Sequence, residues 1–229
     1  MLNILTYNVA QGKYDLSGLN KTITSSGAQI ICLQEYNNKV KQHIKLGSNY
    51  NLIEPGGKQG FFRNVIYTKL PIIEVNFLPT SGEIRNIIMI KVKFKKCVIT
   101  ILNLHLSAGR DLNKSNQRQT QLNDLFKNIT NVKYGIIIGD FNLINDEIPW
   151  SNNISPWYKW NVAPLIPTYC STNLCVKSNL RFRYPFDRCI YQKLTLVNFK
   201  LIGNKSKNSD HYGVIYTFTT QNSSSCIIM

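Results

Sequence analysis

The chain is poor in acidic residues and has no long apolar run. It contains 12 Asp and Glu residues against 27 Lys and Arg residues among its 229, which gives a formal net charge of +15. No stretch approaches the roughly 18 consecutive apolar residues that a membrane span needs. Such a basic chain attracts polyanions, so we expect nucleic acid or an anionic membrane surface as a partner.

The six cysteines include no C-x-x-C pair, and their spacing matches no zinc site. The first residues lack the basic segment and the apolar segment of a secretory leader, and they predict a β-strand instead. Together these absences favour a reducing compartment, and we expect a cytoplasmic or nuclear protein.

The composition predicts one domain. With 43% hydrophobic residues, the chain can bury one sizeable core but is short for two. Residues 1–220 show no internal repeat and no linker, and residues 221–229 form a polar, Ser-rich tail. We expect a monomer with a single domain over residues 1–220.

Short runs rich in Ile and Val predict buried β-strands. They cover residues 2–7, 29–33, 61–67, 72–77, 86–94, 98–104, 135–138, 189–191 and 214–218. Apolar residues at helical spacing predict helices over 15–26, 39–46 and 116–129, with Asp15 as a candidate N-cap. The hairpin-like succession in the middle argues against a purely parallel sheet, so we predict a mixed α/β sandwich.

Polar residues gather where the predicted strands end. α/β proteins build their sites at such sheet edges. Carboxylates clustered there repel one another unless a cation is present, so we expect a bound cation. The strand-end motifs, in order, are Thr6-Tyr7-Asn8, Leu33-Gln34-Glu35, Asn103-Leu104-His105-Leu106, Gly139-Asp140-Phe141-Asn142, Pro185-Phe186-Asp187-Arg188 and Ser209-Asp210-His211.

In this order the six motifs resemble the endonuclease/exonuclease/phosphatase superfamily, over residues 4–218. That superfamily includes abasic-site endonucleases, tyrosyl-DNA phosphodiesterases, sphingomyelinases and inositol polyphosphate phosphatases. The resemblance implies two mixed β-sheets packed face to face and flanked by helices, a four-layer αββα sandwich. It also implies a catalytic domain over residues 1–220 that hydrolyses a phosphoester with Mg²⁺ or Mn²⁺.

The motifs contain the parts that phosphodiester hydrolysis needs, which are an activated water, a cation and donors for the phosphate oxygens. Glu35 is the best candidate metal ligand, and Asn8 and Asp210 are further candidates. Asp140 is expected to orient and deprotonate the attacking water, with Asn142 positioning that water or the phosphate.

The two imidazoles supply the donors. His105 and His211 are expected to donate to the non-bridging phosphate oxygens, and either Asp187 or Asp210 would set the tautomer of His211. Activity should disappear in Glu35→Gln, Asp140→Asn and His211→Ala.

Several segments resemble the 5′-tyrosyl-DNA phosphodiesterase family, among them residues 105–110, 118–122 and 209–213. The resemblance implies that Tyr169 lines a narrow groove and stacks on a base of a single strand. Arg110, Lys114 and Arg118 flank the His105 motif, and we expect them to contact phosphates of the substrate.

The alternative is a membrane-associated phosphoinositide phosphatase or a sphingomyelinase-like lipid phosphohydrolase. Residues 167–169 and 185–188 resemble inositol polyphosphate 5-phosphatases. The last four residues match a C-a-a-X signal, which predicts prenylation at Cys226 and attachment to an anionic membrane. A catalytically inactive binding protein is a third hypothesis, and the intact acids and histidines argue against it.

Overall fold

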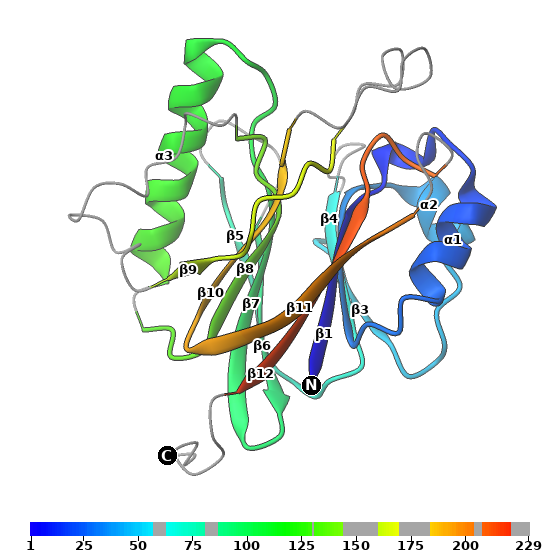
Figure 1. The fold of residues 1–229 in the computed structure, drawn as a ribbon, viewed down its shortest axis with the longest axis horizontal. Coiled ribbons are helices and arrows are strands. Elements are labelled where there is room, and N and C mark those ends of the chain that lie inside the picture. Colours follow the sequence, from blue (N-terminus) through cyan, green and yellow to red (C-terminus); the bar gives the residue numbers. More distant parts are fainter. Residues whose placement is uncertain are drawn as a thin grey trace.

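Two six-stranded β-sheets pack face to face, with helices on both outer faces, in the computed structural model (Figure 1). It describes residues 1–56, 63–80, 87–129, 131–143, 160–169, 184–203 and 208–220. The predicted four-layer αββα sandwich is confirmed. No helix in these ranges is long and apolar enough to cross a membrane.

Each sheet combines one parallel pair of strands with antiparallel neighbours. The parallel pairs are β1–β2 in sheet A and β7–β8 in sheet B. Sheet A has the order β11 (Leu194–Ile202), β12 (Gly213–Thr220), β1 (Leu2–Asn8), β2 (Ile30–Tyr36), β4 (Arg63–Thr68) and β3 (Asn51–Ile53). Sheet B has the order β5 (Ile72–Leu78), β6 (Ile87–Phe94), β7 (Cys97–His105), β8 (Gly135–Asp140), β10 (Asp187–Gln192) and β9 (Asn161–Val162).

Side-chain caps set the starts of the three α-helices in the described ranges. The cap is Asp15 for α1 (Leu16–Thr24), Asn37 for α2 (Asn38–His43) and Asp111 for α3 (Leu112–Asn128). A 3₁₀ turn, η1 (Ala10–Gly12), follows β1. Helix α3 begins four residues before its predicted start, because its first turn has no buried apolar residue that periodicity would reveal.

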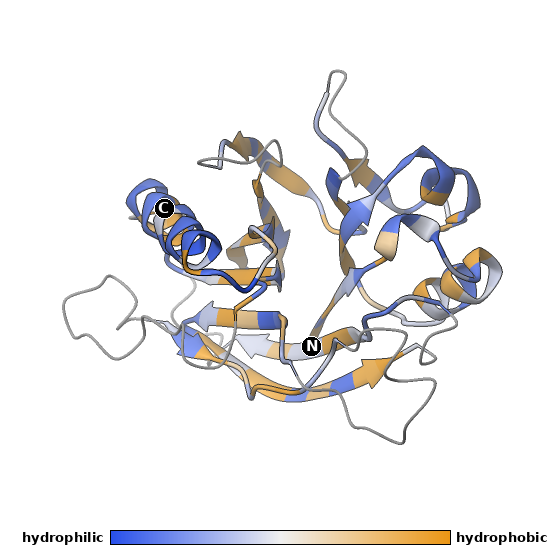
Figure 2. Ribbon diagram, turned by 90° about the horizontal axis from the view of Figure 1, so that it is seen from above, coloured by the Kyte–Doolittle hydropathy of each residue, from blue (hydrophilic) through white to orange (hydrophobic). Residues whose placement is uncertain are grey.

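Three apolar clusters fill the layers. One lies between the sheets, one lies between sheet A and helices α1 and α2, and one lies between sheet B and α3. Figure 2 shows hydrophobic residues concentrated on the strands, while α3 is mostly hydrophilic. Cys32 and Cys189 are buried free thiols.

Three strands were not predicted, namely β3, β9 and β11. Strand β11 is the longest of them, and it lies at an edge of sheet A with Val197 and Leu201 exposed. A bulge between Leu196 and Asn198 interrupts the alternation of inward-facing and outward-facing residues along β11, so the sequence shows no clear strand pattern there.

Gly139 allows β7 and β8 to approach each other directly below the strand ends. Its φ is +143°, and a Cβ at this position would lie 2.0 Å from the carbonyl oxygen of Leu104. We therefore expect Gly139→Ala to lower the free energy of unfolding by about 3 kcal/mol or more, because neither backbone can give way. Urea unfolding measures this effect, and Gly56→Ala, where a Cβ meets no atom within 4 Å, is the matched control. Equal stability of the two variants would contradict the close approach.

Candidate active site

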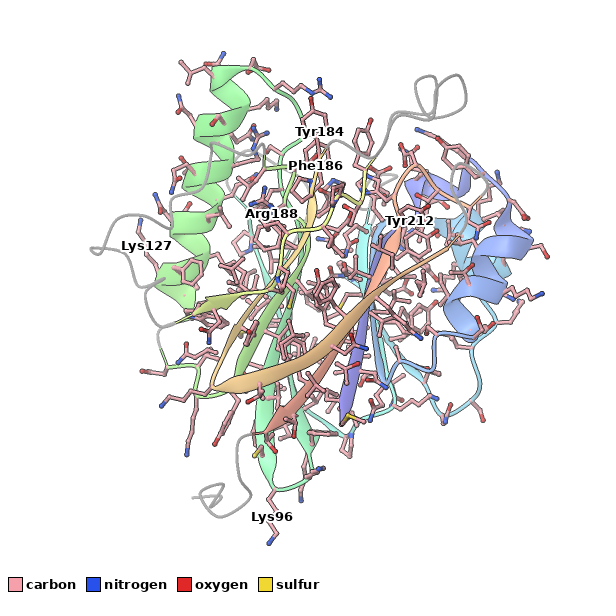
Figure 3. The ribbon with its side chains drawn as sticks, viewed as in Figure 1. Lys96, Lys127, Tyr184, Phe186, Arg188 and Tyr212 are labelled. Atoms are coloured by element: carbon pink, nitrogen blue, oxygen red, sulfur yellow. The ribbon has the colours of Figure 1, made fainter. Side chains whose placement is uncertain are left out.

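The strand-end motifs converge at one end of the sandwich. The parallel strands β1, β2, β7 and β8 end there, while the antiparallel strands β10 and β12 begin there. In the register of sheet B, Asp187 on β10 lies opposite Asp140 on β8, and His105 on β7 lies opposite Asp140 on its other side. Figure 3 places Tyr184 and Phe186 at this end and Lys96 at the opposite one.

The Asp140 carboxylate lies at the centre of the cluster and is 1% exposed. Its Oδ1 accepts the backbone N–H of Asn142 at 3.0 Å, and its Oδ2 accepts Nδ2 of Asn8 at 2.9 Å. Nε2 of His105 lies 3.5 Å from Oδ2, and Nε2 of His211 lies 3.8 Å from it. The Asp140 carboxylate on sheet B thus accepts a hydrogen bond from sheet A and lies close to both imidazoles.

Burial raises the pKa of Asp140 to about 6. The His211 charge opposes this rise, the Asp187 charge adds to it, and the hydrogen bonds from Asn8 and Asn142 oppose it. A carboxyl group with a pKa near 6 is ionised at neutral pH and is still basic enough to accept a proton from water.

His211 is held by Asp187. The Nδ1–H of His211 donates to Oδ2 of Asp187 at 2.7 Å, and both side chains are buried. Burial alone would lower the pKa of His211, but the Asp187 carboxylate, followed by Asp140 and Asp210, raises it to about 10. The imidazole is therefore protonated at neutral pH, with Nε2–H directed at the Asp140 side. Of the two expected partners, Asp187 sets the ring's orientation.

Asn8 connects the two carboxylates of the site. Its Nδ2 donates to Oε1 of Glu35 at 3.3 Å as well as to Asp140, and its Oδ1 accepts the backbone N–H of Ala10 at 3.0 Å. Gln11 donates to the second oxygen of Glu35 at 3.1 Å. Asn8 thus orients both carboxylates, while its expected role as a metal ligand stays a prediction.

Two site residues adopt a left-handed backbone conformation that favours glycine. Glu35 has φ of +54° and Asn142 has φ of +50°. Such a conformation costs about 1 kcal/mol or more in a residue with a side chain, and it clusters at functional sites. The side chain of Asn142 donates to the carbonyl of Leu106 at 3.1 Å, so it also holds the loop after His105. Its contact with water or phosphate stays a prediction.

The donor set fits a hard divalent cation at Glu35. This side chain is partly exposed, and its two hydrogen bonds come from neutral amides, which leave its negative charge uncompensated. In the described ranges, no three His, Cys, Asp or Glu side chains form a metal cluster. Mg²⁺ suits such a site because it binds through one or two carboxylates and keeps several waters. Asp210 is partly exposed beside His211, and its expected metal contact stays a prediction.

Arg118 was expected to contact the substrate, and the structure corrects this. Its side chain is 0% exposed and donates to the carbonyls of Ser107 and Gly109 at 2.8 Å each. Gln121, one turn further along α3, accepts the N–H of Ser107 and donates to its hydroxyl. Arg118 and Gln121 therefore fix the loop after His105, and Arg118 cannot reach a bound phosphate.

Aromatic side chains extend from His211 to Arg110 along the rim of the site. The ring of Tyr169 lies 5.0 Å from that of His211 and stacks on Phe186 at 5.0 Å. Phe186 stacks on Tyr184 at 5.3 Å, and the Arg110 guanidinium lies 4.6 Å from the Tyr184 ring. The predicted substrate residues Tyr169 and Arg110 thus belong to one partly exposed surface. Lys114 lies on α3 and donates to Gln117, and Cys226 lies outside the described residues.

Sequence reasoning missed three residues that support the site. Gln11 orients Glu35, Ser209 donates to the carbonyl of Asn8 at 2.7 Å, and Thr168 accepts the N–H of Asp187 at 3.1 Å. Neutral polar side chains give no charge signal. Ser209 lies within the last strand-end motif and Gln11 lies three residues after Asn8, but nothing in the sequence indicates the hydrogen bonds that they donate.

Comparisons with known proteins agree with this architecture. A model of the Endonuclease/Exonuclease/phosphatase family matches residues 5–211. The structure of D. rerio TDP2 complexed with single strand DNA product is similar, with 21% identity and a TM-score of 0.79 over 96% of this chain and 99% of that chain. C. elegans TDP2 is 20% identical, with a TM-score of 0.76 over 95% of this chain and 74% of that chain.

A functionally unknown conserved protein from Enterococcus faecalis V583 is 14% identical, with a TM-score of 0.75 over 96% of this chain and all of that chain. At these identities the likeness of the solved structures shows a shared fold. A search of curated proteins finds no significant match.

Proposed function

The chain belongs to the Endonuclease/Exonuclease/phosphatase family, and from that premise we propose that it is a phosphodiesterase dependent on Mg²⁺ or Mn²⁺. Its proposed substrate is nucleic acid, or a phosphotyrosyl linkage between protein and nucleic acid. The observation that carries the proposal is the buried Asp140 carboxylate beside the imidazoles of His105 and His211, next to the partly exposed Glu35.

Asp140 acts as the general base. Its pKa near 6 leaves it ionised at neutral pH, and the hydrogen bonds from Asn8 and Asn142 fix both of its oxygens. A water held at this carboxylate loses its proton to Asp140 as the water oxygen attacks phosphorus, and the P–O ester bond to the leaving alcohol or phenol breaks.

His211 and His105 stabilise the charge that develops on the phosphate. The Asp187 carboxylate keeps His211 protonated, so its Nε2–H is a charged donor in a buried setting, where such a bond is strong. Glu35 would hold the divalent cation, which when bound would offset the negative charge of the phosphate.

The rim of the site supports a nucleic-acid substrate. Tyr169 and Tyr184 are partly exposed aromatic rings beside the catalytic cluster, and the exposed Arg110 lies next to them. Rings of this kind stack on bases regardless of sequence, and a neighbouring cation contacts the phosphate backbone. The solved complex of D. rerio TDP2 contains a single-stranded DNA product, which makes the same class of ligand the first one to test here.

Arg110→Gln should weaken the binding of a single-stranded oligonucleotide and reduce its salt dependence. Loss of one phosphate contact lowers the slope of log K against log salt by about 0.7. Fluorescence anisotropy across a salt series, in the absence of divalent cations, measures both quantities. Lys127→Gln is the matched control, because this exposed charge lies on α3 far from the site (Figure 3). Identical slopes for the two variants would remove Arg110 from the binding surface.

A substrate panel tests the proposed function. The protein with Mg²⁺ is incubated separately with a 5′-tyrosyl oligonucleotide, an abasic duplex, a phosphatidylinositol phosphate and sphingomyelin. We expect turnover of a nucleic-acid substrate that EDTA abolishes. Turnover of the lipids alone would reject this proposal in favour of a lipid phosphohydrolase.

A further inference from the structure

A fully buried polar network crosses the sandwich directly behind the site. Asn103 on β7 lies on the same face of its strand as Ile99 and Ile101, which belong to the core between the sheets. Its side chain is 0% exposed and reaches across to sheet A. Nδ2 of Asn103 donates to the carbonyls of Leu33 and Val65, at 3.0 Å and 2.8 Å.

The network includes two further buried side chains. Gln34 on β2 donates to Oδ1 of Asn103 at 2.7 Å and to the hydroxyl of Thr6 on β1 at 3.1 Å. Gln34 and Thr6 are each 0% exposed. The amide of Asn103 therefore has both donors and its acceptor engaged, all with sheet A.

These contacts lie where the pairing of β2 with β4 becomes irregular. Leu33 pairs with Val65, and the next pair is Tyr36 with Arg63. Leu33 and Tyr36 are three residues apart, yet both face the cluster beneath α1 and α2, so β2 carries one extra residue between them. Asn103 thus donates hydrogen bonds to the carbonyls of Leu33 and Val65, the last regular residue pair before this bulge.

The bulge is what brings Glu35 into the site. In a regular strand Gln34 and Glu35 would point to opposite faces of the sheet. Gln34 points between the sheets, and the left-handed backbone of Glu35 allows its carboxylate to reach Asn8 and Gln11 near that same side. The position of Glu35 therefore depends on the bulge.

We propose that Asn103 is a positioning residue that holds the β2 bulge from the opposite sheet and thereby directs Glu35 toward the divalent cation. An apolar side chain at this position would leave the carbonyls of Leu33 and Val65 and the Gln34 amide without the partner that Asn103 supplies. The site is divided between the sheets, with Asn8 and Glu35 on sheet A and His105 and Asp140 on sheet B. The Asn103 amide fixes the two halves relative to each other.

The test compares Asn103→Leu with Ile101→Val, which lies on the same face of β7 and leaves the network intact. Backbone amide exchange is followed for Val9, whose N–H donates to the carbonyl of Gln34 at 3.0 Å, and for Ile31 in the regular part of β2. In Asn103→Leu we expect exchange at Val9 to rise at least about 10-fold more than exchange at Ile31. Equal rises at the two amides would indicate general destabilisation and overturn the inference.

The second readout is the affinity for Mn²⁺ without substrate, measured by electron paramagnetic resonance. Residues that orient a metal ligand change metal affinity by about 10- to 100-fold, so we expect a loss of about 10-fold in Asn103→Leu and none in Ile101→Val. An unchanged affinity would overturn the inference. If Asn103→Leu does not fold, Asn103→Ser removes the same two amide donors with a small polar side chain, and the same results are expected.

The effect of Asn103 on catalysis rests on the proposed function. The experiments distinguish a failure of this inference from a failure of the proposed function. If the wild-type protein neither binds Mn²⁺ nor cleaves any phosphodiester, the proposed function fails. The exchange of the Val9 amide still decides whether Asn103 holds the bulge.

Discussion

Replacing Asp140 by Asn lowers the rate constant for phosphodiester hydrolysis by about 10²- to 10⁴-fold, the range expected for loss of a general base. The amide keeps the shape of the carboxylate, but its single oxygen can accept only one of the two hydrogen bonds that Asp140 accepts from Asn8 and from the Asn142 backbone. It cannot take a proton from water. The loss should therefore appear in kcat, with a much smaller change in KM.

The measurement is steady-state kinetics on the substrate that the panel identifies. Asp124→Asn, a partly exposed carboxylate on α3, is the matched control and should keep full activity. The thermal midpoint of each variant excludes unfolding as the cause. Retention of more than a tenth of the wild-type kcat in Asp140→Asn would assign the base to another group.

The second large effect is expected for Asp187→Asn, with a loss of about 10²-fold or more in turnover. The Asp187 carboxylate accepts Nδ1–H of His211 at 2.7 Å, and its charge is the main influence that raises the pKa of that ring to about 10. Without this charge, only Asp140 and Asp210 oppose the effect of burial, so the pKa of His211 falls and less of the ring is protonated at a given pH. A neutral, misoriented imidazole is a poor donor to a phosphate oxygen.

Nuclear magnetic resonance titration of the His211 ring in metal-free protein measures this change directly. We expect the wild-type ring to titrate near pH 10 and the Asp187→Asn ring to titrate several pH units lower. Because the folded-state pKa lies above the unfolded value of 6.5, the protonated ring stabilises the fold fully below pH 6.5 and this contribution is lost as pH rises through 10. The free energy of unfolding should therefore fall over that window in the wild type and much less in Asp187→Asn. Unchanged titration in the variant would exclude the Asp187–His211 pair as the cause.

Much of the fold follows from local patterns. Runs of Ile and Val marked the buried strands, and Asp15 marked the start of α1, because burial and capping depend on neighbouring residues. Strand β11 was missed because its outward residues are exposed and a bulge breaks its alternation. The start of α3 was missed because Asp111 caps a turn without buried apolar residues.

The assignment of Arg118 was wrong for a related reason. In the sequence, an arginine on a helix beside a catalytic motif indicates a phosphate contact. Its actual partners are the backbone carbonyls of Ser107 and Gly109. Every residue has a backbone carbonyl, so no sequence pattern indicates which carbonyls an arginine will bind. Charge alone therefore does not distinguish a buried arginine that supports a loop from an exposed one such as Arg110.

That acids, amides and imidazoles stand at the ends of buried strands could be predicted from the chain, because an apolar run that breaks into polar residues is a local property. How these side chains combine depends on the packing of the two sheets. Asp187 rather than Asp210 orients His211, Asn8 joins Asp140 to Glu35 across 132 and 27 residues of chain, and a bulge in β2 turns Glu35 inward. These contacts depend on the register of two sheets packed against each other, and that register is set by the whole core.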